Sequence, residues 1–244
     1  MITTETKKYL ERWPGLRIEN ETVTGTVEFV ASYNKQNNLF QVTDDLNYSE
    51  ENTPLYCSFD ITIDVPTGDY SKLPSLLIHE TGYGIERHIN TTDGKACLCS
   101  PLAENEFLVP EFSFEKYFEE LVLPFLYSQV YFSAFGIWPW FDYSHGHNGI
   151  LESYGRITDP NTEECVSMLK KYKKGWEMMR PYLLQKDYIK GHTPCFCGKH
   201  NHMRRCHPFI LKGIQRLKED IKRKSISLED PEMPTQNELE KKTD

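Results

Sequence analysis

The sequence predicts an α+β fold in which one helix precedes an antiparallel sheet and further helices follow it. Two segments, residues 22–33 and 55–65, alternate apolar and polar side chains with the period of a half-buried strand. From residue 113 onward, apolar residues instead recur every three or four positions, which is typical of helices. The 244 residues are 39% hydrophobic and 13% aromatic, so the chain has enough apolar surface for a core.

The first 80 residues predict a helix and then a meander. Residues 3–13 form the expected helix, with Thr3 or Thr4 as its cap and Pro14 after its end. A polar stretch, residues 34–53, separates the first two strands, and Pro66 and Gly68 mark a turn after the second. Because consecutive strands usually pair, an antiparallel meander follows. Its strands are expected at 22–33, 55–65 and 73–79.

The rest of the chain alternates between an irregular segment and helices. Residues 81–108 have no clear period, and so long a stretch without regular structure is usually functional. The last twenty residues, 225–244, are polar and are expected to be disordered. Helices are expected at 113–135, at 161–174 and 174–184 around a break at Gly175, and at 208–224.

Charge and hydropathy exclude several classes of protein. The net charge of −8 argues against general binding to nucleic acids or anionic membranes. Residues 121–141 lack charged side chains and are about as long as a bilayer span, but they contain two prolines and many aromatics, so we expect a buried core helix. The first 14 residues are charged and lack the apolar core of a signal peptide, so a cytoplasmic protein is expected.

The C-terminal cysteines predict a metal site. Seven cysteines, an odd number without an export signal, indicate metal ligands and reactive thiols and not a disulfide framework. Three thiols and one imidazole would form a closed tetrahedral site, which is typical of structural zinc. The ligands would be Cys195, Cys197, Cys206 and His207.

The spacing of these ligands resembles the SEC-C zinc motif, with a departure at residues 198–202 that leaves His200 or His202 as an alternative to His207. Zinc would then fold a small module, residues 191–224, that has too little core of its own. The basic residues around it form either a solvated face or a docking site for an acidic partner; they are Lys199, Arg204, Arg205, Lys212, Arg216 and Lys222.

A second motif lies in the irregular segment, where His88-Ile89-Asn90 is followed by Asp93-Gly94 and then by Cys97-Leu98. This order resembles the ubiquitin-conjugating enzymes, in which His-Pro-Asn and an Asp-Gly or Asn-Gly precede a Cys-Leu after a helix and an antiparallel meander. Ile89 replaces the proline, and the gap to Cys97 is one residue shorter than usual. The resemblance spans residues 1–155 and implies a ubiquitin-conjugating-enzyme-like domain over residues 1–190.

Two further features narrow this resemblance. The segments "FGIWPWFDY" and "SHGHNGILESY", residues 135–154, and the tandem Cys97-Leu98-Cys99 resemble bacterial ubiquitin-conjugating-like proteins of antiphage CBASS operons of the short type II class. That resemblance implies a cGAS-like nucleotidyltransferase as partner, whose C-terminus is joined to protein amines without a dedicated activating enzyme.

The chemistry of this motif can also be considered from its residue types. A thiol that carries an acyl group must be accessible, and the Asp93-Gly94 turn can present Cys97. An amide such as that of Asn90 can stabilise the oxyanion formed on attack. The resemblance gives Asn90 this role and has His88 hold the loop. Cys99 receives the acyl group from Cys97, attacks the substrate first, or is a small buried apolar residue.

His145 is a further candidate, as a base or orienting group near Cys97, because imidazole titrates near neutral pH. Alternatively it supports the turns at Gly146 and Gly149, or binds a metal together with His147. Cys57 and Cys165 are expected in the core. Three other functions stay open: a non-catalytic adaptor of the same fold, a thiol redox protein, and a conventional conjugating enzyme that needs an activating enzyme.

Overall fold

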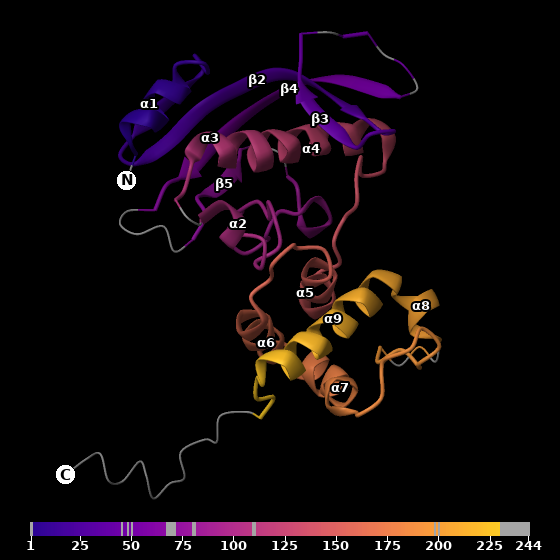
Figure 1. Cartoon of the computed structure of the whole chain (residues 1–244). Helices are drawn as coiled ribbons and strands as arrows, with labels where there is room; N and C mark the ends of the chain where they lie inside the picture. Colours follow the sequence, from indigo (N-terminus) through magenta and orange to yellow (C-terminus); the bar gives the residue numbers. More distant parts are fainter. Residues whose placement is uncertain are drawn as a thin grey trace, which may run out of the picture. The chain divides into compact units, whose positions relative to one another are not determined.

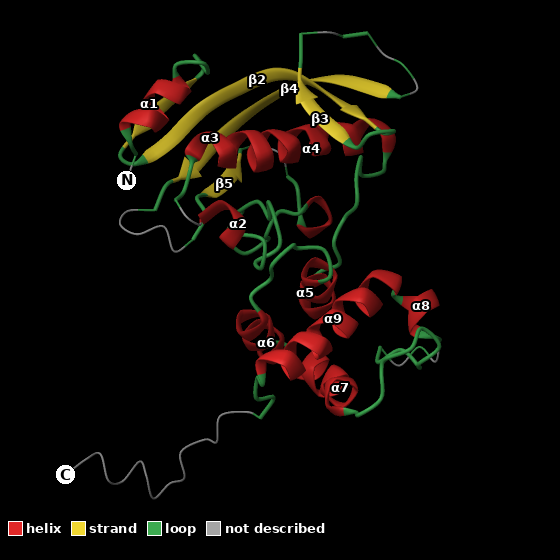
Figure 2. Cartoon of the chain, viewed as in Figure 1, coloured by secondary structure: helices red, strands yellow, loops and turns green. Residues whose placement is uncertain are grey.

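The computed structural model describes residues 2–44, 46–47, 49, 51–66, 72–79, 82–108, 111–197, 199 and 201–229. It confirms a mixed α+β chain with an antiparallel sheet and helices (Figures 1 and 2). The chain divides into two compact units, Met1–Asp142 and Tyr143–Asp244. The sheet belongs to the first unit, and the second unit is helical in its described residues.

The five-stranded sheet has the order β1-β2-β4-β5. Strand β2 (Thr22–Asn34) pairs with β4 (Asn52–Asp64) along its whole length, and β5 (Ser75–Ile78) covers the other edge of β4. The two short strands β1 (Leu16–Glu19) and β3 (Leu39–Val42) pair with opposite ends of the remaining edge of β2. The three predicted strands are therefore present. The sequence did not predict β1 and β3, because each has four residues and β3 lies inside the polar stretch.

A two-residue turn fixes the register of β1 and β2. Glu19 pairs with Thr22, and the two residues between them, Asn20 and Glu21, have φ values of 48° and 64°. Positive φ at both positions is the geometry of a type I′ turn, whose twist matches that of the strands it joins. The turn thus leads directly into β2, which forms the longest strand pair of the sheet together with β4.

Helix α1 (Thr4–Leu10) begins where the sequence predicts, because the Thr3 hydroxyl accepts a hydrogen bond from the Thr6 N–H at 3.1 Å. It ends at Leu10, three residues before the predicted end. Tyr9 is buried and lies edge-on to Phe114 and Phe118, with ring centroids 6.2 and 5.9 Å away. These contacts attach α1 to the long helical segment that follows the sheet.

The long helical segment consists of α3 (Phe114–Tyr117), a π-helical turn (Phe118–Val122) and α4 (Leu123–Phe135), and it runs along one face of the sheet (Figure 1). Pro124 lies in the first turn of α4, directly after the π-turn. The predicted face is buried: Phe114, Phe118, Leu121, Phe125 and Gln129. The described part of the chain contains no helix long and apolar enough to cross a membrane.

The second unit contains the remaining helices. The break between α6 and α7 falls at Tyr172 and not at Gly175, which is buried inside α7, where the ring of His147 occupies the space a side chain would need. The sequence also missed α5, because its glycines were interpreted as turns. The bounds are α5 Gly146–Tyr154, α6 Thr162–Lys171, α7 Lys173–Leu184, α8 Met203–Cys206 and α9 Pro208–Lys224.

Helices α5 and α9 cross with their backbones in contact. A Cβ atom at Gly213 would collide with the carbonyl oxygen of Leu151, and one at Gly155 would lie 2.9 Å from the Gly213 nitrogen. Beside the crossing, the Tyr154 hydroxyl donates to Asp220 at 2.8 Å. Helix α9 packs against α5, and the zinc module that we expected at residues 191–224 belongs to the same compact unit as α5, Tyr143–Asp244.

The beginning of the predicted tail is ordered. Leu228 is 6% exposed, and its carbonyl oxygen accepts a hydrogen bond from Arg180 Nε at 3.2 Å. Residues 225–229 therefore pack against the second unit, contrary to the expected disorder. Residues 230–244 lie outside the described part of the chain.

Candidate functional site

The predicted cysteine motif forms a small hairpin. Its first arm follows the 3₁₀ turn Ile85–Arg87, and two hydrogen bonds join the arms: Asn90 N–H donates to the Lys95 carbonyl at 2.9 Å, and Cys97 N–H donates to the His88 carbonyl at 2.8 Å. Between them, Ile89 and Ala96 form an antiparallel bridge. The register therefore sets His88 opposite Cys97 and Asn90 opposite Lys95.

This register separates buried from functional side chains. Ile89 is 6% exposed and belongs to the core. Side chains alternate across a paired strand, so Asn90 and Cys97 belong to the opposite face from Ile89 and Ala96. Two of the predicted site residues thus share the outer face of one hairpin.

The turn of the hairpin explains the Asp-Gly pair. Gly94 has φ 71°, a conformation that favours glycine, and its N–H donates to the Asn90 carbonyl at 2.8 Å. Asp93 accepts a hydrogen bond from the Lys95 N–H at 3.2 Å. The second arm also joins the sheet, because Ala96 N–H donates to the Leu76 carbonyl of β5 at 2.8 Å. The hairpin is therefore anchored to the sheet edge.

The two cysteines of the motif differ in accessibility. Cys97 is exposed, and its thiol lies 3.9 Å from the Cys99 carbonyl oxygen, toward which it can donate. Cys99 is half-buried and packs against the core. Desolvation raises the pKa of both thiols above its ordinary value, and the carboxylate of Glu104 acts in the same direction. Cys97 is thus the reachable thiol, and desolvation disfavours the ionised form of both thiols.

Asn90 holds the turn with one end of its amide. Its Oδ1 accepts a hydrogen bond from the Thr92 N–H at 2.9 Å, which fixes the amide plane. The side chain is exposed, and its Nδ2 donates to no other described residue. An oriented N–H donor is therefore present on the face of the hairpin that presents Cys97.

His88 is held by two residues that the sequence did not single out. Its Nε2 lies 3.0 Å from Asp142 Oδ1, and its ring centroid lies 5.0 Å from that of Trp138. The side chain is only 17% exposed, and the backbone has φ 58°. Asp142 also raises the pKa of Cys97 through its charge.

Arg87, one residue earlier, fastens the hairpin to α4. Its guanidinium donates to the Gln129 side chain at 2.9 Å, to the Gln129 carbonyl at 2.6 Å and to the Ser133 hydroxyl at 3.0 Å. Gln129 is fully buried, and its amide donates back to the Arg87 carbonyl at 3.2 Å. A single uncharged polar residue on an otherwise apolar helical face was the only signal in the sequence for this contact.

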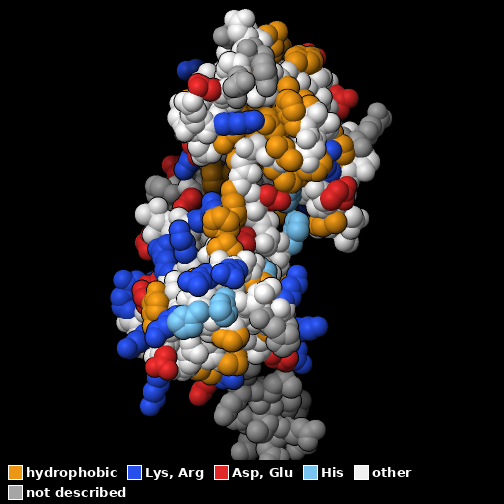
Figure 3. Space-filling model, turned by 90° about the vertical axis from the view of Figure 1, so that its right-hand side faces the viewer, with side chains coloured by type: hydrophobic (Ala, Val, Ile, Leu, Met, Phe, Trp, Pro, Cys, Tyr) orange, Lys and Arg blue, Asp and Glu red, His pale blue; other side chains and the backbone are white. Residues whose placement is uncertain are grey.

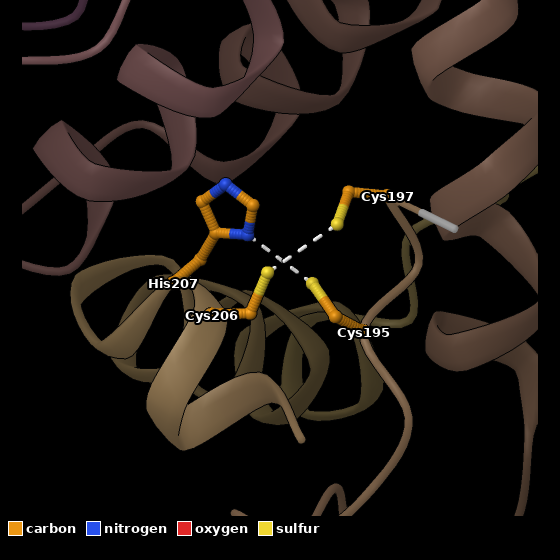
Figure 4. Close-up of side chains that lie close together, drawn as sticks. All are labelled: Cys195, Cys197, Cys206 and His207. Atoms are coloured by element: carbon orange, nitrogen blue, oxygen red, sulfur yellow. Dashed lines mark hydrogen bonds between the residues drawn. The ribbon is translucent and has the colours of Figure 1, made fainter. Parts of the chain in front are cut away.

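The second site is the predicted metal centre (Figure 4). One possible ligand atom from each of four residues lies within 4.8 Å of every other, and these residues are Cys195, Cys197, Cys206 and His207. The Cys195 sulfur lies 3.2 Å from His207 Nδ1, and the Cys197 and Cys206 sulfurs are 3.4 Å apart. Zinc–sulfur bonds of about 2.3 Å imply sulfur–sulfur edges of about 3.8 Å in a tetrahedron, so the four atoms fit one metal ion.

The local backbone brings these ligands together. Cys195 N–H donates to the Asn201 carbonyl, and Met203 N–H donates to the Thr193 carbonyl, both at 2.9 Å. Helix α8 then presents Cys206, and His207 follows it directly. Of the two alternative ligands, His202 is exposed and lies outside the cluster, whereas His200 is not among the described residues.

His145 lies in the second unit, as the residue that precedes α5. The tight loop beside it depends on Glu152, which accepts hydrogen bonds from both the backbone and the hydroxyl of Ser144, at 2.8 and 3.0 Å. His147 lies against the rings of Tyr172 and Phe196. Within the described residues, the four-residue cluster is the group assembled for a metal, and neither His145 nor His147 belongs to it.

The two units have opposite charge. Residues 1–142 contain 22 aspartates and glutamates against nine lysines and arginines, whereas residues 143–229 contain 17 lysines and arginines against nine acidic residues. Figure 3 shows lysine and arginine side chains gathered on one face of the second unit, next to histidines. The overall charge of −8 therefore conceals a basic unit.

Comparison of the chain with protein-family models, with curated proteins and with solved structures gives no match.

Proposed function

We propose that this protein is a cysteine-dependent acyltransferase in which Cys97 holds the C-terminal acyl group of a partner protein as a thioester and passes it to an amine. The observation that supports this best is the exposed Cys97 thiol on an anchored hairpin that also presents the Nδ2 donor of Asn90. The order of elements, a helix, antiparallel strands, the cysteine hairpin and further helices, is compatible with the sequence resemblance to ubiquitin-conjugating enzymes.

The reaction has two steps. The Cys97 sulfur attacks the carbonyl carbon of the donor, the bond from that carbon to the donor's leaving group breaks, and a thioester forms. An acceptor amine then attacks the thioester, a new amide forms, and the thiol is released. Each step passes through an oxyanion, and we assign its stabilisation to the Asn90 amide N–H.

The partner follows from the resemblance. We propose that the donor is the C-terminus of a cGAS-like nucleotidyltransferase encoded in the same operon and that protein lysines are the acceptors. A cytoplasmic location agrees with the need of Cys97 for a reducing environment.

We further propose that the metal of the second unit is zinc and that it is structural. Four protein ligands leave no open coordination position, and sulfur and imidazole ligands suit zinc. Phe196, which lies between Cys195 and Cys197 in the sequence, is buried. Its ring centroid is 6.0 Å from that of Tyr182 in α7. A metal bound by these four ligands would hold the segment around Phe196 against α7.

The test mixes the purified protein with the nucleotidyltransferase of its operon, without ATP or an activating enzyme, and analyses the mixture by intact mass and non-reducing gel. We expect an adduct that thiols cleave and that peptide mapping assigns to Cys97. Cys97→Ala should abolish it, while Cys99→Ala, the matched control, should retain it. An adduct that survives Cys97→Ala contradicts the assignment, and one that needs ATP and an activating enzyme supports the conventional route.

A non-catalytic adaptor is the second candidate, and the raised pKa of the Cys97 thiol favours it, because a protonated thiol is a weak nucleophile. An adaptor would form a stable complex with the nucleotidyltransferase and would yield no adduct under either condition. The same gel and a size-exclusion run therefore separate the two functions.

A further inference from the structure

We propose that one edge of β4 binds an extended, basic segment of a partner protein, which joins the sheet as a further strand. The part concerned is residues 54–58, which we call the open β4 edge. Strand addition gains affinity from backbone hydrogen bonds and selectivity from alternate side chains. The inference does not depend on acyl transfer at Cys97, and it adds a protein-binding site to the first unit.

The backbone of β4 turns alternate residues toward its two neighbours. Directly after the strand, the Val65 N–H donates to the Glu21 carbonyl, which continues the register of β2 and β4. Odd-numbered residues of β4 therefore exchange hydrogen bonds with β2, and the backbone groups of even-numbered residues face the other edge. The Asp60 carbonyl agrees with this parity, because it accepts a hydrogen bond at 2.9 Å from the His79 N–H, directly after β5.

Strand β5 covers only one end of this edge, because it pairs with residues 61–64 of β4. Beyond it, the outward groups of the open β4 edge are the Pro54 carbonyl and the N–H and carbonyl of both Tyr56 and Ser58. Within the described part of the chain, no residue forms a hydrogen bond with these five backbone groups. Both Tyr56 and Ser58 are exposed. An added strand would supply the missing hydrogen-bond partners.

The side chains along the open β4 edge determine which kind of strand fits it. On the outer face of the sheet, the hydroxyls of Tyr56 and Ser58 donate to the Glu28 carboxylate at 2.5 and 3.4 Å. On the face that packs against α4, Leu55 and Phe59 are half-buried apolar residues. Residues that lie opposite each other in neighbouring strands share a face of the sheet. A strand in which basic and apolar residues alternate therefore matches both faces.

Charge favours a basic partner over a second copy of this chain. The exposed carboxylates of Glu28 and Asp60 both belong to the outer face of the sheet. Residues 1–142 as a whole contain 22 aspartates and glutamates against nine lysines and arginines. Sheets use charged side chains and prolines to keep identical edges from pairing, and these carboxylates together with Pro54 oppose pairing with a second copy. Lysines and arginines of a partner strand would instead meet opposite charge.

The test uses the full-length protein and short, capped, fluorescent peptides. In the first peptide lysine and valine alternate, in the second the same residues are grouped by type, and in the third glutamate replaces lysine. Fluorescence anisotropy measures binding. We expect the alternating lysine peptide to bind about tenfold more tightly than the grouped one, because only the first can pair along the edge with its lysines on one face. Added salt should weaken this binding, and the glutamate peptide should not bind.

A proline substitution tests the edge itself, since it removes one outward N–H and leaves the hydrogen bonds to β2 in place. Ser58→Pro should weaken binding of the alternating peptide about tenfold. Ser58→Thr, the matched control, keeps the N–H and the hydroxyl and should change the affinity by less than about threefold. Amide exchange followed by NMR needs no variant. The Tyr56 and Ser58 amides should exchange fast in the protein alone and slowly with the peptide, whereas the Cys57 amide, which faces β2, should be protected throughout.

Several results would overturn the inference. Equal binding of the alternating and grouped peptides, or unchanged binding by Ser58→Pro, would show that charge alone attracts the peptide. Slow exchange at Tyr56 and Ser58 without peptide, together with a dimer in sedimentation, would assign the edge to a second copy. Absence of binding by all three peptides contradicts the site as well. If Ser58→Pro does not fold, the exchange measurement on the unaltered protein decides. None of these measurements uses the Cys97 thiol, so failure of the proposed acyl transfer would leave their result unchanged.

Discussion

At the scale of single residues, burial distinguishes the free thiols of the chain. Cys97 is exposed, whereas Cys57 and Cys165 are fully buried, and burial raises the pKa of Cys57 to about 12. Thiolates are the reactive species, so both accessibility and ionisation limit modification. The site residue should therefore differ from the core cysteines in a simple chemical experiment.

We predict that iodoacetamide modifies Cys97 first in the metal-loaded protein and leaves Cys57 and Cys165 unmodified until the chain unfolds. Because the pKa of Cys97 is raised, its modification rate should level off at a higher pH than that of a free cysteine peptide. A free cysteine peptide, the reference, should level above about pH 8.5. Peptide mapping after short reactions measures both. A Cys97 rate that levels below pH 8 would contradict the raised pKa.

How much of the site could be predicted also depends on single residues. Asn90, Cys97 and the four metal ligands belong to short motifs, and local spacing is sufficient to find them. Asp142 lies 54 positions after His88, and only folding of the helix between them brings the two together. The Gly146 and Gly149 positions were interpreted as turns, but only the first has a positive φ, and the second begins a buried helical turn.

At the scale of elements, the contact between Arg87 and Gln129 fixes the hairpin to α4. We predict that Gln129→Leu destabilises the protein by about 2 kcal/mol, because it removes the buried side-chain acceptor of Arg87 Nε and the amide that donates to the Arg87 carbonyl. Amide exchange at Ala96 and Cys97 should accelerate with it. Urea unfolding and hydrogen exchange with mass spectrometry make the measurement.

The control for this change is Arg12→Lys. Arg12 contacts Glu115 and Glu119 with its side chain 60% exposed, and exposed ion pairs contribute at most about 1 kcal/mol. The Arg12→Lys variant should leave amide hydrogen exchange in the hairpin unchanged. Equal effects of the two variants would show that the Arg87 contact has no special role.

The elements themselves were predicted to different degrees for physical reasons. Long periodic segments such as β2, β4 and α9 match their predicted positions closely, because their periodicity is repeated over ten or more residues. The strands β1 and β3 have four residues each and no room for a pattern. The π-turn at Phe118–Val122 was also invisible, since it keeps the same face buried as an α-helix would.

At the scale of the whole molecule, the two units should respond separately to loss of metal. We predict one zinc per chain by elemental analysis, and loss of it with Cys195→Ser or with a strong chelator. Structural zinc in small folds is linked to folding, so amides of α9 should lose protection from exchange while those of β2 keep theirs. Cys97→Ser, the control, should retain both metal and protection. Uniform loss of protection across both units would contradict this independence.

The glycine crossing of α5 and α9 has a consequence for how the chain can vary. At Gly213 even a methyl group collides with the backbone of the facing helix, and at Gly155 it meets the Gly213 nitrogen closely. The test is a library of all single substitutions selected for soluble expression. Almost no substitution of Gly213 should survive the selection, whereas most substitutions of its exposed neighbour Lys212 should survive. In distantly related sequences, we therefore expect Gly155 and Gly213 to be retained more often than the residues exposed on the surface.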